Sequence, residues 1–400
     1  MIMEPKNWNV YLFRDILERV EVPVNVESNK EYVQIGIRSH GKGLFYKEPV
    51  LGKALGNKQV FWIQPNCFIL NVVFAWEQAI TKTTENEIGM IGSHRFPMYR
   101  PKNDLVDIDY LIYYFLTKRG TDILESASPG GAGRNRTLGQ ERFLKSKITL
   151  PPLSEQQKIA TILSTQDKVI ELKEKLLVQK QQQKKHLMQQ LLTGKKRLPG
   201  FGGEWKTIHL NEISCRIETK NTVGNNNVLT ISARYGLINQ TEFFDKVIAS
   251  DDKSNYYLLS KDEFAYNRSY SKGYPYGTIK RLKRYVQGVV SPLYICFAVN
   301  KKLASLDFLE QYFEASIINR EIQSIVQEGA RNHGMLNVAV DDFFRIKITM
   351  PEIEEQKEIA KILSAADHEI DLLQKFIEAE KQKKKTLMQL LLTGKVRVKI

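Results

Sequence analysis

The sequence predicts an α+β chain with pseudo-two-fold symmetry, in which two similar mixed α/β domains are joined by two long antiparallel helices. The first observation behind this prediction is a repeat: residues 147–195 and 347–395 are identical at 26 of 49 positions without a gap. The second is its long period, because solenoid repeats recur every 20–50 residues or so. The repeat therefore indicates two whole domains, each followed by the same helical element.

The repeated segments themselves predict long amphipathic helices. Apolar residues recur every three or four positions from Ile159 to Leu192, and no Pro or Gly interrupts 153–193. Ser154 and Gln157 fit a capping box at the start, and Gly194 fits a helix end. A helix of about 40 residues reaches about 60 Å at 1.5 Å per residue. Two such helices are expected to pair as an antiparallel coiled coil that fixes the separation of the domains.

Four parts follow along the chain. We expect a first globular domain at 1–150, a first helical spacer at 151–197, a second globular domain at 198–350 and a second spacer at 351–400. The segment 198–204 is rich in glycine and is interpreted as a flexible joint.

The two globular domains show weaker internal similarity. In the first, 32–37 and 60–73 are predicted to form strands, and 109–116 a helix. In the second, 227–231, 259–267 and 307–313 resemble these segments. The domains are therefore expected to share a fold and to differ in surface, whereas the much more similar helices are expected to share one function.

Composition favours a polyanionic partner. The chain has 59 Lys and Arg against 45 Asp and Glu, a net charge of +14, which points to nucleic acid. Cys67, Cys215 and Cys296 lie far apart without a CxxC pair, which excludes a zinc ribbon or disulfide framework and predicts reduced core residues in the cytoplasm. No signal peptide is recognised, and the longest apolar stretch, 289–299, is too short to cross a membrane.

No catalytic or metal-binding constellation is found in the sequence. A GxxxxGK[ST] phosphate loop is absent. The segment Ser291-Pro292-Leu293-Tyr294 approaches the loop of amino-methyltransferases, but it lacks the second proline and an accompanying glycine-rich cofactor strand. The acidic pairs at 251–252 and 341–342 are expected to cap turns or strand edges. We therefore predict neither catalytic residues nor a metal site.

The strongest nucleic-acid signal is the segment 267–284, where cations, amides, aromatic residues and glycines alternate. Arg and Asn can bind purine edges through two hydrogen bonds, and Lys, Ser and Tyr suit phosphates. Two further pairs of loops recur at matching positions in the two domains, 38–42 with 234–235 and 134–136 with 331–333, and the segment 89–102 adds a weaker candidate. The candidate DNA-binding residues are Arg38, His40, Lys42, Arg95, Arg134, Asn135, Arg136, Arg234, Tyr235, Asn267, Arg268, Ser269, Tyr270, Lys272, Tyr274, Lys280, Arg281, Arg331, Asn332 and His333.

The whole pattern resembles the specificity subunit of type I restriction–modification systems. The resemblance is carried by the helix entry at 148–156, the helix exit at 187–195 and their repeats at 348–356 and 387–395, with departures at Glu352 and Glu354. It implies two target-recognition domains, each reading half of a bipartite double-stranded DNA site, and helices that set the gap between the halves. It also implies docking of two modification subunits, which bind S-adenosylmethionine and methylate adenine, and of motor-nuclease restriction subunits. This chain would then have neither catalysis nor a cofactor of its own.

Two other hypotheses make different predictions. A stand-alone methyltransferase or nuclease should bind S-adenosylmethionine as an isolated chain. A purely structural coiled-coil adaptor predicts that replacing Asn267 and Arg268 by Ala leaves DNA affinity unchanged, whereas a recognition subunit should lose specificity for one half-site.

Overall fold

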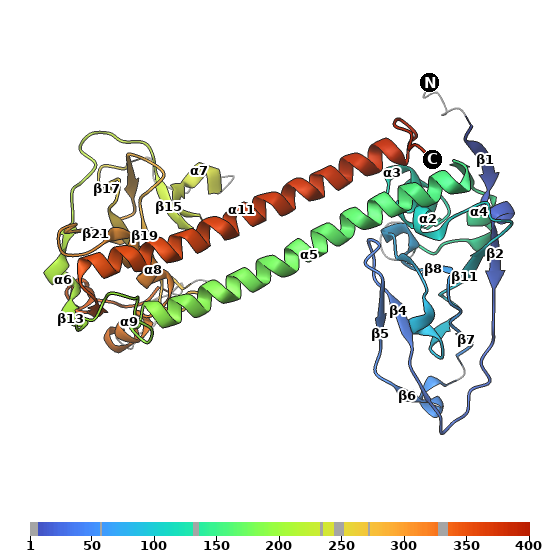
Figure 1. Cartoon of the computed structure of the whole chain (residues 1–400), viewed down its shortest axis with the longest axis horizontal. Coiled ribbons are helices and arrows are strands. Elements are labelled where there is room, and N and C mark those ends of the chain that lie inside the picture. The colour runs from blue at the N-terminus through green and yellow to red at the C-terminus, as the bar shows by residue number, and fades with distance from the viewer. Residues whose placement is uncertain are drawn as a thin grey trace. The chain divides into compact units, whose positions relative to one another are not determined.

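The chain divides into two compact units in the computed structural model, Met1–Glu174 with Phe376–Ile400, and Lys175–Lys375 (Figure 1). The structure describes residues 7–56, 58–130, 136–232, 235–243, 252–270, 273–326 and 335–400. Each unit contains one globular head, the first half of one long helix and the second half of the other. Each unit is therefore built from segments that lie far apart in the sequence.

Two helices of 39 residues confirm the prediction of long helical segments: α5 (Leu153–Leu191) and α11 (Ile353–Leu391). They begin one residue earlier than expected, so Ser154 lies inside the first turn and the predicted capping box is wrong. The buried Gln156 stabilises this helix start instead. Its side chain donates to the Pro151 carbonyl (2.9 Å) and accepts from the Asp107 backbone N–H (2.9 Å).

The second helix start repeats this arrangement. Gln356 donates to the Pro351 carbonyl at 2.8 Å and accepts from the Ser305 backbone N–H at 2.8 Å. Asp107 and Ser305 are themselves the N-caps of the head helices α2 (Ile108–Phe115) and α8 (Leu306–Glu314). One glutamine in each copy therefore joins the start of the long helix to the start of a head helix, which gives the recurring Glu-Gln dipeptide a structural role.

Both long helices end at a left-handed glycine, as predicted. Gly194 and Gly394 each have φ of +69°, a conformation that glycine adopts without steric cost. The chain then turns back, and the backbone N–H groups of Lys196 and Val396 donate to the carbonyls of Gln190 (3.1 Å) and Leu390 (3.2 Å).

The first head is built around a four-stranded antiparallel sheet with the order β2-β11-β8-β9. Smaller antiparallel pairs, β1·β12, β7·β10, β4·β5 and β3·β6, complete it. Its strands are β1 (Asn9–Leu12), β2 (Leu17–Val20), β3 (Glu31–Tyr32), β4 (Ile35–Ile37), β5 (Leu44–Tyr46), β6 (Val50–Leu51), β7 (Val60–Trp62), β8 (Phe68–Leu70), β9 (Ile80–Lys82), β10 (Ile91–Ser93), β11 (Met98–Pro101) and β12 (Lys147–Leu150). Its helices are α1 (Phe13–Ile16), α2, α3 (Lys118–Ser126), α4 (Gln140–Lys145) and the short 3-10 turns η1 (Gly52–Leu55), η2 (Ala75–Glu77) and η3 (Glu85–Glu87).

The second head repeats this plan. Its four-stranded sheet has the order β14-β21-β18-β19, and its smaller pairs are β13·β22, β17·β20 and β15·β16. Its strands are β13 (Lys206–His209), β14 (Ser214–Ile217), β15 (Leu229–Ser232), β16 (Gly236–Asn239), β17 (Tyr257–Ser260), β18 (Phe264–Asn267), β19 (Thr278–Arg281), β20 (Gln287–Val290), β21 (Ile295–Val299) and β22 (Lys347–Met350). Its helices are α6 (Leu210–Ile213), α7 (Gln240–Phe243), α8, α9 (Asn319–Ile325) and α10 (Val340–Phe344). The heads therefore share the fold that their faint sequence similarity predicts, and β3·β6 is an addition in the first.

Stacked aromatic residues form the core of each head. In the first, Phe13 stacks on Phe143 with ring centroids 4.7 Å apart; in the second, Tyr266 stacks on Phe343 at 4.8 Å. Apolar residues of both long helices join these cores: Ile159 and Leu163 with Leu391 and Leu392 in the first unit, and Leu191 and Leu192 with Ile359 and Leu363 in the second. Because each helix end is part of a hydrophobic core, a head cannot rotate about its helix pair without exposing apolar surface.

The three cysteines are free thiols, as the sequence predicts. Cys67 and Cys296 lie in the cores, whereas Cys215 is exposed, so its prediction as a core residue is wrong. Cys215 lies on β14, which is an edge strand of its sheet: within the described residues, β14 pairs only with β21.

Candidate nucleic-acid interface

The loop between β4 and β5 carries three of the predicted residues, and all three are exposed: Arg38, His40 and Lys42. His40 has a positive φ of 61°, and its backbone N–H donates to the Glu77 carbonyl at 2.8 Å, which holds the loop against η2. The Arg38 guanidinium turns back on its own hairpin, because it donates to the Leu44 carbonyl and lies 5.3 Å from the Phe45 ring centroid. The loop is thus an ordered, positively charged tip.

Two further candidates of the first head lie near the end of β8. Arg95 is exposed on the turn between β10 and β11. Arg136 lies over the ring of Trp76, with the guanidinium carbon 5.5 Å from its centroid, and the Trp76 indole N–H donates to the Val73 carbonyl at 3.1 Å. A cation stacked on an aromatic ring keeps its edge available for hydrogen bonds.

The predicted segment 267–284 of the second head is largely engaged in internal contacts. Arg268 donates to the Leu293 carbonyl from two guanidinium nitrogens (3.2 and 3.0 Å) and to the Val338 carbonyl (3.0 Å). The Asn267 side chain accepts from the Ser269 backbone N–H at 3.0 Å. Tyr270, in contrast, is 64% exposed. Within this segment, Arg268 therefore ties strands and loops together, and Tyr270 presents an aromatic face to solvent.

The cations that follow are neutralised by the acidic face of α8. Arg281 is only 8% exposed and pairs with Asp307 (2.5 Å) and Glu310 (3.0 Å). Lys280 pairs with Glu314, which also accepts from the Tyr274 hydroxyl at 2.7 Å. Burial, and then this hydrogen bond to a carboxylate, raise the pKa of Tyr274 well above its ordinary value. A buried or paired cation contributes little positive potential at the surface.

The remaining predicted residues cannot be placed in the same way. Tyr235 is 58% exposed at the start of β16. Seven candidates lie outside the described residues: Arg134, Asn135, Arg234, Lys272, Arg331, Asn332 and His333. The matched loops 134–136 and 331–333 therefore stay a prediction.

Two kinds of side-chain contact join the long helical segments, and the first links the start of one helix to the chain just after the end of the other in both units. In the first unit, the buried Glu155 accepts two hydrogen bonds from Arg397, both at 2.6 Å. In the second unit, Glu355 accepts two from Arg197, at 2.8 and 2.7 Å. These hydrogen bonds raise the pKa of both guanidinium groups above the ordinary arginine value. The sequence repeat contains both glutamates, but the two arginines lie just beyond it.

The second kind of contact runs along the helices and sets their antiparallel register. Asp167 pairs with Lys384 in the first unit, and Asp367 with Lys184 in the second. Around these shared pairs the units differ: Glu174 pairs with Lys381 at 2.6 Å in the first, whereas Glu369 pairs with Lys180 at 2.7 Å in the second. The described contacts confirm that α5 and α11 run antiparallel within each unit.

Two negative findings concern the described part of the chain. No group of three or more His, Cys, Asp or Glu side chains there is placed to hold a metal ion. None of its helices has the length and apolar character needed to cross a membrane.

Comparison with known proteins identifies the family. The family model for the type I restriction modification DNA specificity domain matches residues 25–180 and 204–381, so the chain belongs to this family. Two relatives from Methanocaldococcus jannaschii, the putative type I restriction enzyme MjaX specificity subunit and the MjaVIII specificity subunit, are 25% and 24% identical. Each alignment spans 99% of this chain, and it spans 95% of the MjaX subunit and 94% of the MjaVIII subunit.

Solved structures agree on the fold. The chain resembles an HsdS subunit from Thermoanaerobacter tengcongensis with a TM-score of 0.56 and 16% identity, covering 98% of each chain. It resembles the S subunit from M. genitalium with a TM-score of 0.56 and 13% identity, covering 97% of this chain and 99% of that one. As a specificity subunit with two target-recognition domains, the chain is a non-catalytic DNA-recognition component of a type I restriction–modification complex. Membership of such a complex implies DNA and partner subunits.

Proposed function

We propose that each head reads one half of a bipartite, asymmetric site on double-stranded DNA. The observation that carries this proposal is the contrast within the repeat: the heads share strand order and helix attachment, yet differ in the side chains of equivalent loops. Equivalent frames with different contact residues suit two different short sequences, since base readout depends on individual side chains at the groove.

We further propose that the helix pair sets the number of base pairs between the half-sites and docks two modification subunits. Those subunits would supply S-adenosylmethionine and the methylation of adenine, and restriction subunits would join for cleavage, in the cytoplasm. The length of α5 and α11, 39 residues each, corresponds to about 58 Å of helix at 1.5 Å per residue. The identical residues at helix entries and exits support a job that both copies share.

The proposed contact residues are the exposed members of the predicted set, Arg38, His40, Lys42, Arg95, Tyr235 and Tyr270, together with Arg136 and the candidates that lie outside the described residues. Arg268, Lys280 and Arg281 are supported as structural residues by their internal partners. We therefore expect their replacement to act first on the stability of the second head.

The function is tested with the full chain bound to the modification subunits of its own system. Selection from a randomised duplex library, or mapping of methylated adenines in the host genome, should return two different short motifs separated by a fixed unspecified gap. A contiguous motif, or no enrichment at all, would overturn the proposal. Binding of S-adenosylmethionine by the chain alone would favour a methyltransferase instead.

The spacer role has its own test. Seven residues of helix are inserted after Gln181 in α5 and, at the facing point of the second unit, after His368 in α11. The insertion adds about 10 Å, or about three base pairs at 3.4 Å each. The gap should lengthen by that amount and both half-site motifs should stay the same; altered motifs, or an unchanged gap, contradict the spacer role.

A further inference from the structure

A groove of about 480 Å³ in the first head lies where β4, the end of β8 and the turn after β10 meet. Figure 1 labels β4 and β8 in the first head, below the start of α5. Three cations line the groove, Lys47, Lys58 and Arg95, and so does the Asn71 side chain. No Asp or Glu belongs to its lining.

The charge of this groove is not neutralised from within. All three cations are exposed, and among the described residues no carboxylate lies within ion-pair distance of any of them. Unpaired cations gathered in a concave surface without acids focus a positive potential there. The groove therefore suits a polyanion, and this distinguishes it from the paired cations that follow β18 in the second head.

The turn that carries Arg95 is held rigidly by four hydrogen bonds. The Phe96 backbone N–H donates to the Ser93 carbonyl (2.9 Å), and the Arg95 N–H donates to the Ser93 hydroxyl (3.3 Å). On the other side, the Arg95 carbonyl accepts from Val72 (3.0 Å), and the Pro97 carbonyl accepts from Leu70 (3.4 Å). The backbone is thus fixed on β8 while the Arg95 side chain is exposed, so the backbone needs no further ordering when a ligand binds.

The second head contains the same turn with different chemistry. The Tyr294 backbone N–H donates to the Ser291 carbonyl (3.0 Å), and Leu293 donates to the Ser291 hydroxyl (3.3 Å). Leu293, 52% exposed, thus occupies the position of Arg95. The equivalence extends to β8 and β18, because Asn71 and Asn267 each accept from the backbone N–H two residues further on. The two heads therefore hold this turn in the same backbone arrangement but place different side chains at its tip, as recognition of two different DNA sequences requires.

We propose that this groove is the base-reading surface of the first head, that Arg95 recognises a guanine in the major groove, and that Lys47 and Lys58 bind the flanking phosphates. This rests on the proposed function of DNA recognition. An exposed guanidinium on a fixed turn can make two hydrogen bonds to guanine O6 and N7, the commonest specific contact of arginine. Lysine ammonium groups act as point charges on phosphates and fix the register of the protein on the duplex.

The test compares Arg95→Gln with the wild-type protein in the full chain and its modification subunits. Selected sites should lose their preference for guanine at one position of one half-site. Binding to the wild-type site should weaken by about 5- to 150-fold, and the other half-site should keep its sequence. Arg95→Lys should lose most of the preference too, because a lysine cannot reproduce the planar fork.

Arg142→Gln is the matched control, since Arg142 is an exposed arginine on α4 outside the groove and its loss removes the same charge. Its half-sites should be unchanged. Lys47→Gln and Lys58→Gln should weaken binding equally at all sequences. If Arg95→Gln leaves both half-sites intact while the wild-type protein still selects a bipartite site, the groove is not the reading surface and the proposed function survives. If the wild-type protein selects no sequence, the proposed function itself fails.

Discussion

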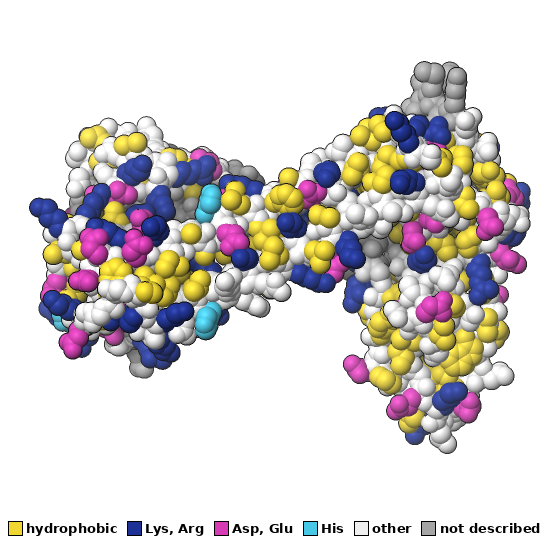
Figure 2. Space-filling model, viewed as in Figure 1, with side chains coloured by type: hydrophobic (Ala, Val, Ile, Leu, Met, Phe, Trp, Pro, Cys, Tyr) yellow, Lys and Arg dark blue, Asp and Glu magenta, His cyan; other side chains and the backbone are white. Residues whose placement is uncertain are grey.

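The cations beside α8 in the second head and the cations of the groove in the first head differ in their partners. In the second head, Arg281 and Lys280 lie beneath the carboxylates of α8, and Arg284 pairs with Glu242 at 3.0 Å. In the first head, Lys47, Lys58 and Arg95 line a groove without an acidic neighbour. Figure 2 shows the mixture on the visible face of the second unit, where Lys and Arg side chains alternate with Asp and Glu. Density of positive charge along a sequence therefore says little about where positive potential reaches solvent.

The long helical segments, in contrast, make the same contact between a buried glutamate and an arginine in both units, so the two copies can be compared directly. Replacing Glu155 or Glu355 by Ala should lower the free energy of unfolding by about 3 kcal/mol each. That is the lower end for breaking a buried ion pair, since Arg397 and Arg197 stay partly exposed. Urea denaturation of the two variants checks this, with Glu358→Ala on the exposed face of α11 as the control. Unequal losses would show that the repeated contact is not energetically symmetric.

Replacing Arg281 in the second head should lower the stability of the protein, whereas replacing Arg95 in the first head should change the DNA sequence that is selected. Arg281→Gln removes a buried guanidinium from two carboxylates and should lower the free energy of unfolding by about 2 kcal/mol. Arg95→Gln changes an exposed side chain and should stay within about 0.5 kcal/mol of wild type. Denaturant midpoints measure both. If the Arg281→Gln protein were as stable as wild type but selected an altered half-site, Arg281 would be a DNA-reading residue and not a structural one.

A smaller effect should distinguish unpaired from paired lysines. Each of Lys47→Gln and Lys58→Gln should reduce the slope of log affinity against log salt concentration by about 0.9, the value for one phosphate contact on duplex DNA. Lys283→Gln should change it less, because Lys283 already pairs with Glu310 at 3.2 Å. Titrations at several salt concentrations provide the slopes. Equal changes for all three lysines would mean that internal pairing does not decide which cations meet DNA.

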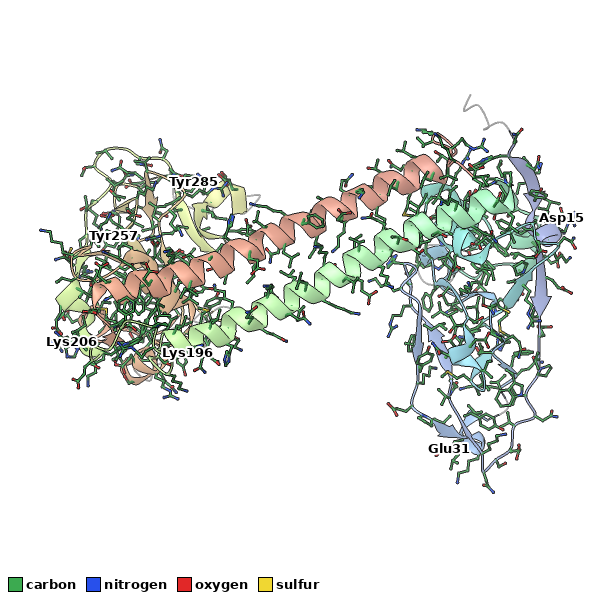
Figure 3. All side chains as sticks on the ribbon, viewed as in Figure 1. Asp15, Glu31, Lys196, Lys206, Tyr257 and Tyr285 are labelled. Carbon is green, nitrogen blue, oxygen red and sulfur yellow. The ribbon has the colours of Figure 1, made fainter. Side chains whose placement is uncertain are left out.

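The smallest effect concerns Tyr285, labelled in Figure 3 beside the strands of the second head. Its hydroxyl accepts from the Asn239 backbone N–H (3.2 Å) and donates to Glu242 (2.9 Å). Tyr285→Phe removes both hydrogen bonds and should cost about 1 kcal/mol of stability, because the Glu242 carboxylate is exposed and its bond contributes little, without changing either half-site. Thermal unfolding measures the cost, and library selection would reveal any unexpected change of motif.

Periodic features of the fold could be read from the sequence. The apolar spacing predicted both long helices to within a few residues, and Gly194 marked the end of the first. The helix start was less predictable. Ser154 has the right residue type for an N-cap, but the start is stabilised by the buried Gln156, whose side chain accepts from the backbone N–H of Asp107, 49 positions earlier in the chain. Local capping rules do not include a partner that only the folded chain brings near.

The candidate site was predicted less well for the same reason. Arg38, His40, Lys42 and Arg95 are exposed, as a contact residue requires, whereas Arg281 is buried. No pattern along the chain connects Lys47, Lys58 and Asn71 with Arg95, because four separate segments have to come together before these side chains line one groove.

By itself, the sequence determined the duplication, the two helices and the family, because a repeated pattern and helical spacing are properties of the linear chain. Tertiary structure alone decided which cations are neutralised and which remain available. Electrostatic pairing depends on distances of a few ångströms between residues that the sequence separates widely, such as Arg281 and Asp307 or Glu155 and Arg397, and folding sets those distances.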